Sequence, residues 1–440
     1  MNSRRVERGN LSSIDRLSSL PDSLLIGILC YLDLKEAVKT AVLSKQWRFV
    51  WTDLPRLELK EKSREREKIV KFVGFVNRII VVGRRTALNY FHVEFYYEKH
   101  FASDVDAWVG FAVRNKVENL SLLLDTTMSS DEFRDYMTNN FDKSYTLSSV
   151  WDVDWRYLTR LSLGRVIMSQ QQLEIVVSGC PVLESLELNM CRGFQRLRIR
   201  NSSFRRLCVD RGAPFPRGGC RNCLREISAA NMRELDVSMR AARVDFRVTD
   251  APALEQATIR IFEQNSEVSP CHVAIDAQKL FQDICHVNKL HLEAYTAGVI
   301  SILVKTGFWK LPQFTRLKNL ITYGANKHIS GIIALLKSSP NLNNLVISCY
   351  NCSNNETREA SIQKVQIAEE LADCDLLHLE FVDIAYFGIT MVPLAQIILE
   401  RAPALVEMVI RNTSSSTTIS DDFVNKFQAL LVYPKSSIYM

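Results

Sequence analysis

The sequence lacks long apolar segments. No stretch approaches the roughly 18 consecutive apolar residues that a membrane helix needs. Residues 1–10 are polar and basic and hold no apolar segment, so we expect no secretory signal. Without such a signal, the eleven cysteines are expected to stay reduced, as in the cytosol or nucleus. The sequence therefore predicts a protein of the cytoplasm or nucleus without membrane contact.

Signatures of catalysis are also missing. The chain contains no G-x-S-x-G, P-loop, H-E-x-x-H or G-x-G-x-x-G motif. Cys220-x-x-Cys223 and Cys349-x-x-Cys352 have the local spacing of zinc ligands, but the two pairs stand far apart in the sequence, so we interpret them as core or surface thiols. The net charge of +6 on 440 residues does not by itself indicate a nucleic-acid partner. We expect no catalytic residue, no metal and no cofactor.

A compact group of three helix signals lies between residues 20 and 51. Pro21 suits the first position of a helix with one apolar face. Asp33 and Glu36 have the spacing of a capping box for a second helix. A third helix carries two tryptophans and ends before Pro55. The segment therefore predicts a small three-helix module.

This module is too short to bury its own apolar residues. Domains below about 40 residues rarely fold without metals, disulfides or partners. One interpretation is that the module docks on another protein, with leucine, isoleucine and tryptophan as buried anchors. The other interpretation is a helical cap on the domain that follows.

The segment resembles a plant-type F-box. The resemblance rests on D-R-L-S-S-L-P-D-S-L-L at 15–25, I-L at 28–29, L-K-E-A-V at 34–38, V-L-S-K-Q-W-R at 42–48 and Trp51. It implies that residues 15–54 bind an Skp-type adaptor, which links the chain to a cullin–RING ubiquitin ligase. Gly27, inside the first helix, and Gln46, where the family often has arginine, depart from the pattern.

The resemblance also implies which residues contact the adaptor or support that contact. They are Leu20, Pro21, Leu24, Leu25, Ile28, Leu29, Val42, Leu43, Trp47 and Trp51. Pattern alone leaves open which of them, in particular which tryptophan, belongs instead to the core of the module.

A repeated phrase dominates the rest of the chain. Its clearest copies are P-V-L-x-x-L-x-L at 181–188, P-A-L-x-x-A-x-I at 252–259, P-N-L-x-x-L-x-I at 340–347 and P-A-L-x-x-M-x-I at 403–410. Weaker copies are Leu158/Leu161/Leu163, Phe194/Leu197/Ile199, Phe204/Leu207/Val209, Met232/Leu235/Val237, Val287/Leu290/Leu292 and Leu377/Leu379. One such unit cannot cover its own apolar side, so neighbouring units must stack into a curved solenoid of parallel strands. The uneven spacing predicts an irregular arc.

The repeats at 55–375 resemble the leucine-rich region of plant F-box proteins. Residues 376–440, with I-L-E-R-A-P-A-L-V-E-M-V-I at 398–410, resemble the FBD region that ends many of them. Residues 1–14 are expected to form a disordered leader. The predicted fold class is α/β, with a small N-terminal three-helix F-box module followed by an irregular leucine-rich-repeat solenoid with parallel strands.

Arginine is concentrated in one segment of the solenoid. Ten arginines lie between residues 192 and 225, opposed there by Asp210 alone. If Arg196, Arg198 and Arg200 lie on a repeat strand, they share its exposed, concave face. Arg160 and Arg206 are predicted at the equivalent position of neighbouring repeats. Guanidinium groups suit carboxylates and phosphates, so this face is predicted to bind an acidic or phosphorylated target segment.

Three functions remain open at this point. The first is a non-catalytic substrate receptor of an SCF-type ubiquitin ligase. The second is an arginine-rich scaffold for anions or nucleic acid, whose affinity would fall steeply with salt. The third is an F-box protein that binds the adaptor and never joins a cullin. The alternative for the arginines is that they bind no target and form a solvated face, neutralised by Glu187, Glu234 and Asp236 of neighbouring strands.

Overall fold

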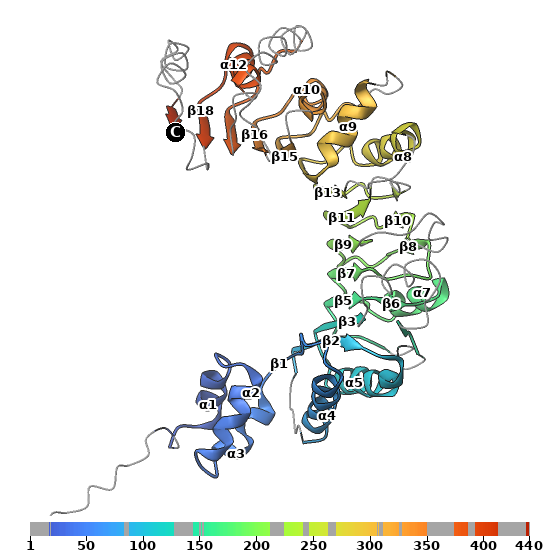
Figure 1. The fold of residues 1–440 in the computed structure, drawn as a ribbon, viewed down its shortest axis with the longest axis vertical. Helices are drawn as coiled ribbons and strands as arrows, with labels where there is room; N and C mark the ends of the chain where they lie inside the picture. The colour runs from blue at the N-terminus through green and yellow to red at the C-terminus, as the bar shows by residue number, and fades with distance from the viewer. Residues whose placement is uncertain are drawn as a thin grey trace, which may run out of the picture.

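The computed structural model describes residues 17, 19–82, 88–126, 144–148, 151, 154–211, 224–240, 246–262, 270–305, 307, 311–324, 328–349, 374–385, 392–411 and 437–439. The described chain forms an arc with a small helical module at its N-terminal end (Figure 1). The main strands line the inner, concave side of the arc, and most helices lie along its outer side (Figure 1).

The N-terminal module consists of α1 (Asp22–Leu29), α2 (Leu34–Lys39), the 3-10 helix η1 (Thr40–Val42), α3 (Trp47–Val50) and the 3-10 helix η2 (Trp51–Asp53). The Asp33 carboxylate accepts a hydrogen bond from the backbone N–H of Glu36 at 2.8 Å and so caps α2, as predicted. The second half of the predicted capping box was wrong, because the Glu36 carboxylate pairs with Lys39 at 2.6 Å.

In the part of the chain that the structure describes, fourteen strands form one parallel sheet. In order, they are β1 (Arg56–Lys60), β2 (Tyr90–Tyr97), β3 (Asn119–Thr126), β5 (Arg160–Gly164), β7 (Ser185–Asn189), β9 (Arg206–Asp210), β11 (Glu234–Arg240), β13 (Gln256–Phe262), β14 (Lys289–Ala294), β15 (Asn319–Gly324), β16 (Asn344–Cys349), β17 (Phe381–Ala385), β18 (Glu407–Arg411) and β19 (Ser437–Tyr439). The predicted solenoid of parallel strands is therefore confirmed.

The repeat phrase explains how this sheet is buried on one side. Leu57 and Leu59 of β1 are buried, whereas Arg56, Glu58 and Lys60 between them are exposed. The strands pair so that leucine-type positions stay in register along the sheet. The buried rows form one continuous core that also includes the core of the helical module.

Helices cover the outer side of the sheet at both ends of the arc (Figure 1). They are α4 (Arg66–Val82), the 3-10 helix η3 (Lys99–Phe101), α5 (Ala102–Arg114), α7 (Gln170–Ser178), α8 (Pro270–Asp283), α9 (Thr296–Lys305), α10 (Ile329–Lys337) and α12 (Val392–Arg401). Helices α7, α10 and α12 precede three of the four repeat prolines, and strands β7, β13, β16 and β18 follow the four prolines.

In the middle of the arc, a second sheet replaces the outer helices. It consists of β8 (Arg196–Arg198), β10 (Glu226–Ser228) and β12 (Arg247–Thr249), and a further pair joins β4 (Tyr145–Thr146) to β6 (Val166–Ile167). The Phe194/Leu197/Ile199 copy was therefore wrongly placed in the main sheet. Its three apolar side chains are buried, but they face the core from the outer side.

The C-terminal region continues the same architecture. β17 pairs in register with β16, and β18 pairs in register with β17. Helix α12 packs its leucine and isoleucine residues into the common core. The predicted leader at 1–14 lies outside the described residues. None of the helices among the described residues is both long and apolar enough to cross a bilayer.

Candidate functional site

The core of the helical module takes up four of the ten residues predicted for adaptor contact. Leu25, Leu29, Trp47 and Trp51 are buried, together with Val50. Both tryptophans thus belong to the core of the module. Trp51 is further fixed by a hydrogen bond of 3.1 Å from its indole N–H to the carbonyl of Arg48. These residues support the module from within.

The module leaves other apolar side chains in solvent. Leu24, Ile28, Val42 and Leu43 are exposed, with Val42 at 87% and Leu24 at 55%. Pro21 is exposed as well, and Leu20 is half-buried. Soluble proteins rarely gather so many large apolar side chains on so small a surface without a partner. We call Leu24, Ile28, Val42 and Leu43 the exposed apolar set.

The structure adds two aromatic residues that the sequence did not single out. Tyr31 is 93% exposed, and Phe49 of α3 is also exposed. Tyr31 follows Leu24 and Ile28 at the spacing of successive turns, which could have indicated it. Both residues extend the apolar surface of the module.

Gln46 explains one departure from the family pattern. Its side-chain amide donates hydrogen bonds of 2.9 Å to the carbonyl of Leu20 and to the carboxylate of Asp22. Gln46 lies directly before α3, whereas Leu20 and Asp22 lie at the start of α1. The amide therefore holds the starts of the two helices together.

The concave face of the solenoid is the second candidate surface. Its side chains come from the exposed rows of the main sheet, and several charged ones are paired across strands. Arg260 pairs with Asp236 and, at 2.6 Å, with Glu293. Arg411 pairs with Asp383. The face thus carries charge of both signs, which suits contact with a protein surface of matching charge.

The five predicted arginines do not share one face. Arg160 and Arg206 occupy the same row of the main sheet, with Ser185 between them. Arg196 and Arg198 belong to β8 in the second sheet, on the outer side. The prediction of one arginine face was therefore wrong, because an alternating strand pattern does not specify which sheet the strand joins.

Acidic neighbours accompany some of these arginines. Arg196 lies 3.3 Å from Glu226, and Arg206 lies 3.8 Å from Glu234. Arg198 and Arg200 are exposed on the outer side. Of the three carboxylates expected to neutralise the arginines, Glu234 contacts one of the five.

Two histidines on the concave side of the main sheet, His92 and His291, have lowered pKa values. Burial is the main cause that lowers the pKa of His92, and the nearby Lys60 adds to it. Burial also lowers the pKa of His291, with a further contribution from Arg260. Both imidazoles therefore favour the neutral form in the folded protein.

Metal binding finds no support in the part of the chain that the structure describes. No group of three or more His, Cys, Asp or Glu side chains lies there in a position to hold an ion. Cys220, Cys223 and Cys352 lie outside the described residues.

A small helical module with exposed apolar side chains, joined through a continuous core to an arc of parallel leucine-rich strands, defines an F-box protein with a leucine-rich-repeat domain. Comparison with known families agrees. Residues 17–59 match the model of the F-box domain, and residues 83–433 match the model described as "At1g61320/AtMIF1, LRR domain". The chain belongs to the family of F-box/LRR-repeat proteins.

Relatives from Arabidopsis thaliana share this organisation. The chain is 28% identical to F-box/LRR-repeat protein At5g02910 over 364 residues, which cover 78% of this chain and 74% of that protein. It is 28% identical to F-box/LRR-repeat protein At3g03360 over 367 residues, which cover 76% of this chain and 70% of that protein. It is 30% identical to F-box/LRR-repeat protein 25 over 213 residues, which cover 46% of this chain and 79% of that protein.

Proposed function

We propose that this protein is the substrate-recognition subunit of an SCF-type cullin–RING ubiquitin ligase. In this proposal the F-box module binds an Skp-type adaptor, the adaptor binds a cullin, and the solenoid binds the target protein. The chain itself carries out no chemistry, and ubiquitin transfer belongs to the other subunits. We also propose that the protein works in the cytoplasm or nucleus, where such ligases act.

The exposed apolar set on the F-box module carries this proposal. Fully burying a leucine, isoleucine or valine side chain contributes about 1.5–3 kcal/mol. Leu24, Ile28, Val42 and Leu43 are exposed in the isolated chain, so a partner that covers them gains much of this free energy. The buried Leu25 and Leu29 hold the helix that presents Leu24 and Ile28.

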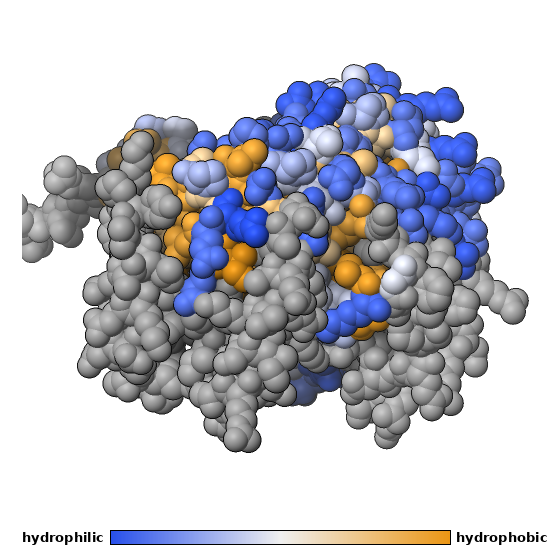
Figure 2. Space-filling model, turned by 90° about the horizontal axis from the view of Figure 1, so that it is seen from above, coloured by the Kyte–Doolittle hydropathy of each residue, from blue (hydrophilic) through white to orange (hydrophobic). Residues whose placement is uncertain are grey.

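The concave face is the proposed site of target binding. Its cross-strand pairs, Arg260 with Asp236 and Glu293 and Arg411 with Asp383, give it a fixed charge pattern. Figure 2 shows one end of the arc seen from above, where apolar residues form separate patches beside a largely hydrophilic part. The target segment is predicted to be acidic or phosphorylated where it meets Arg160 and Arg206.

Adaptor dependence tests the first half of the proposal. The full chain is mixed with a purified Skp-type adaptor and a cullin, and complexes are separated by size-exclusion chromatography. We expect a complex of all three proteins. A wild-type chain that elutes alone at micromolar concentrations would contradict the proposal.

Paired charge reversals test the second half. Arg160→Glu with Arg206→Glu alters the concave face, whereas Arg198→Glu with Arg200→Glu alters the outer face. Proteins modified by the reconstituted ligase are compared by mass spectrometry. We expect targets to be lost with the concave pair and kept with the outer pair. The reverse result would place target capture on the outer arginines, and equal loss of targets with both pairs would also contradict the assignment.

Two alternative functions can be distinguished from the ligase proposal by the same binding experiments. An anion- or nucleic-acid-binding scaffold would bind with an affinity that falls steeply as salt rises, with no need of an adaptor. An F-box protein that acts outside a ligase would bind the adaptor and leave the cullin in a separate chromatographic peak.

A further inference from the structure

The first strand of the solenoid has an open edge. Within the described residues, β1 pairs with β2 on one side and with no strand on the other. The backbone N–H of Glu61 donates to the carbonyl of Glu94, and the N–H of Tyr90 donates to the carbonyl of Pro55. Successive residues of a strand point their backbone N–H and C=O groups to opposite sides. The odd-numbered residues of β1 therefore point these groups toward β2.

It follows that three residues direct their backbone N–H and C=O groups away from the sheet. They are Arg56, Glu58 and Lys60, and all three are exposed. An unpaired strand edge of this kind is a template for another strand. Proteins normally cover, shorten or charge such edges, and here the edge borders a cavity.

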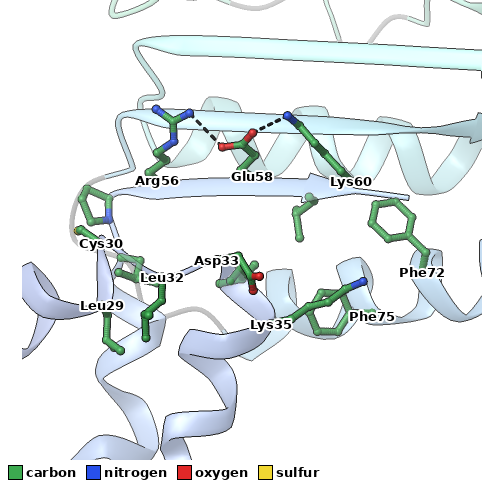
Figure 3. A pocket seen from close by; sticks show the side chains of 14 residues that line it. Leu29, Cys30, Leu32, Asp33, Lys35, Arg56, Glu58, Lys60, Phe72 and Phe75 are labelled. Carbon is green, nitrogen blue, oxygen red and sulfur yellow. Dashed lines mark hydrogen bonds and ion pairs between the residues drawn. The ribbon is translucent and has the colours of Figure 1, made fainter. Parts of the chain in front are cut away.

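A cavity of about 650 Å³ lies between this edge and the F-box module. Its walls include Leu29, Leu32 and Lys35 from the module and Phe72 and Phe75 from α4. Figure 3 shows β1 with its open edge toward the residues of the module, with Asp33 and Lys35 on the opposite side of the gap. The volume falls within the range of typical ligand pockets.

The two sides of the cavity differ in chemistry. Phe72, Phe75 and Leu59 supply an apolar floor on the side of the outer helices. The side chains of Arg56 and Lys60 already pair with Glu58, at 3.0 and 2.5 Å. Hydrogen bonds from Lys60 and Arg56 hold the pKa of the Glu58 carboxyl below its ordinary value.

Lys35 takes no part in the ion pairs of Glu58 with Arg56 and Lys60. It is exposed, it lines the cavity, and its ammonium has no ion pair with any residue that the structure describes. Asp33, on the same wall, already uses its carboxylate to cap α2. An acidic side chain of an occupant would therefore find its partner at Lys35.

We propose that this cavity binds an extended peptide segment of a partner protein, which adds to the open edge of β1 as a further strand. The segment alternates apolar with acidic residues. Its backbone bonds to Arg56, Glu58 and Lys60, its apolar side chains contact Phe72 and Phe75, and an acidic side chain pairs with Lys35. This site is separate from the exposed apolar set and from the middle of the concave face.

A proline substitution tests the backbone bond directly. Glu58→Pro removes the central one of the three outward N–H groups of β1 and leaves the bonds to β2 in place, because edge strands tolerate proline where the N–H faces away from the sheet. Glu58→Ala is the matched control, since it removes the same carboxylate and keeps the N–H. Circular dichroism melting checks that both variants fold.

The probe is a fluorescein-labelled heptapeptide in which leucine and glutamate alternate. Its binding to the full chain is followed by fluorescence anisotropy. We expect Glu58→Pro to weaken binding about tenfold or more relative to Glu58→Ala. The same peptide with alternate backbone amides N-methylated should bind about as poorly to wild type.

A second pair of variants tests the charge without touching the strand. Lys35→Glu should weaken binding about fivefold, and Lys39→Glu on the same helix should not. Lys39 is exposed and lies outside the lining of the cavity.

Three results would overturn the proposal. The first is equal affinity of Glu58→Pro and Glu58→Ala for the peptide. The second is full binding of the N-methylated peptide. The third is a wild-type chain that does not bind the peptide but forms a dimer sensitive to Glu58→Pro, which would assign the edge to a second copy of the chain.

Discussion

Leu24 and Leu25 are neighbours in sequence, and their opposite environments give the sharpest prediction. Leu24 is 55% exposed and Leu25 is fully buried, although both lie on α1. Leu24→Asp should leave the fold intact and disrupt adaptor binding. Leu25→Asp should unfold the module, because it places a carboxylate in an apolar core without a partner.

The expected loss of affinity follows from the exposed area. A fully buried leucine contributes about 1.5–3 kcal/mol, and roughly half of that remains for a partner to cover at Leu24. An unpaired carboxylate in the interface adds a desolvation cost of about 1–3 kcal/mol. The sum of about 2–4.5 kcal/mol corresponds to a dissociation constant about 30- to 1,600-fold higher.

Isothermal titration calorimetry with a purified Skp-type adaptor measures this change. Circular dichroism melting should show the free energy of unfolding of Leu24→Asp within about 0.5 kcal/mol of wild type. Leu25→Asp should lose both stability and binding. Wild-type affinity in Leu24→Asp, or a large drop in its stability, would refute the division of α1 into an outer and an inner face.

Other predictions concern stability. Gly331→Ala should destabilise the solenoid by about 1–3 kcal/mol, because a Cβ there would overlap the carbonyl oxygen of Ala297 on α9; an unchanged melting temperature would contradict this. Gly27→Ala should stabilise α1 by about 1 kcal/mol, since a Cβ there meets nothing within 4 Å. The pKa of His291 is lowered in the folded protein, so the unfolded chain takes up the proton first and stability is lost as the pH falls through the unfolded value near 6.5. His291→Gln should therefore reduce the drop in melting temperature between pH 7.5 and 5.5, and an unchanged drop would refute this assignment.

Most of the main sheet was predictable because its signal is local. A strand with leucine at alternate positions must bury that side, as Leu186 and Leu188 do. β15 was not predicted, because Thr322 occupies the position where the repeat phrase has its last leucine. In the structure this threonine is fully buried, as a leucine would be. β8 was assigned to the wrong sheet, because the alternation of exposed and buried residues along a strand is the same in the main sheet and in the second sheet.

The two faces of α1 could not be assigned from the sequence. Leu24 and Leu25 are adjacent on the helix, and the period of the pattern allows either one to face the core. Tertiary contacts decide the matter, because α1 packs against α3 and against η2. The packing of the F-box module against the core of the solenoid could not be predicted either, because it depends on contacts between segments that are distant in sequence.

The most direct test of the central claim is reconstitution of the complete ligase. The full chain, a Skp-type adaptor and a cullin with its RING subunit are combined and analysed by light scattering coupled to size exclusion. We predict one complex with a single copy of each protein, and its loss with Leu24→Asp. A wild-type chain that joins neither the adaptor nor the cullin would contradict the account.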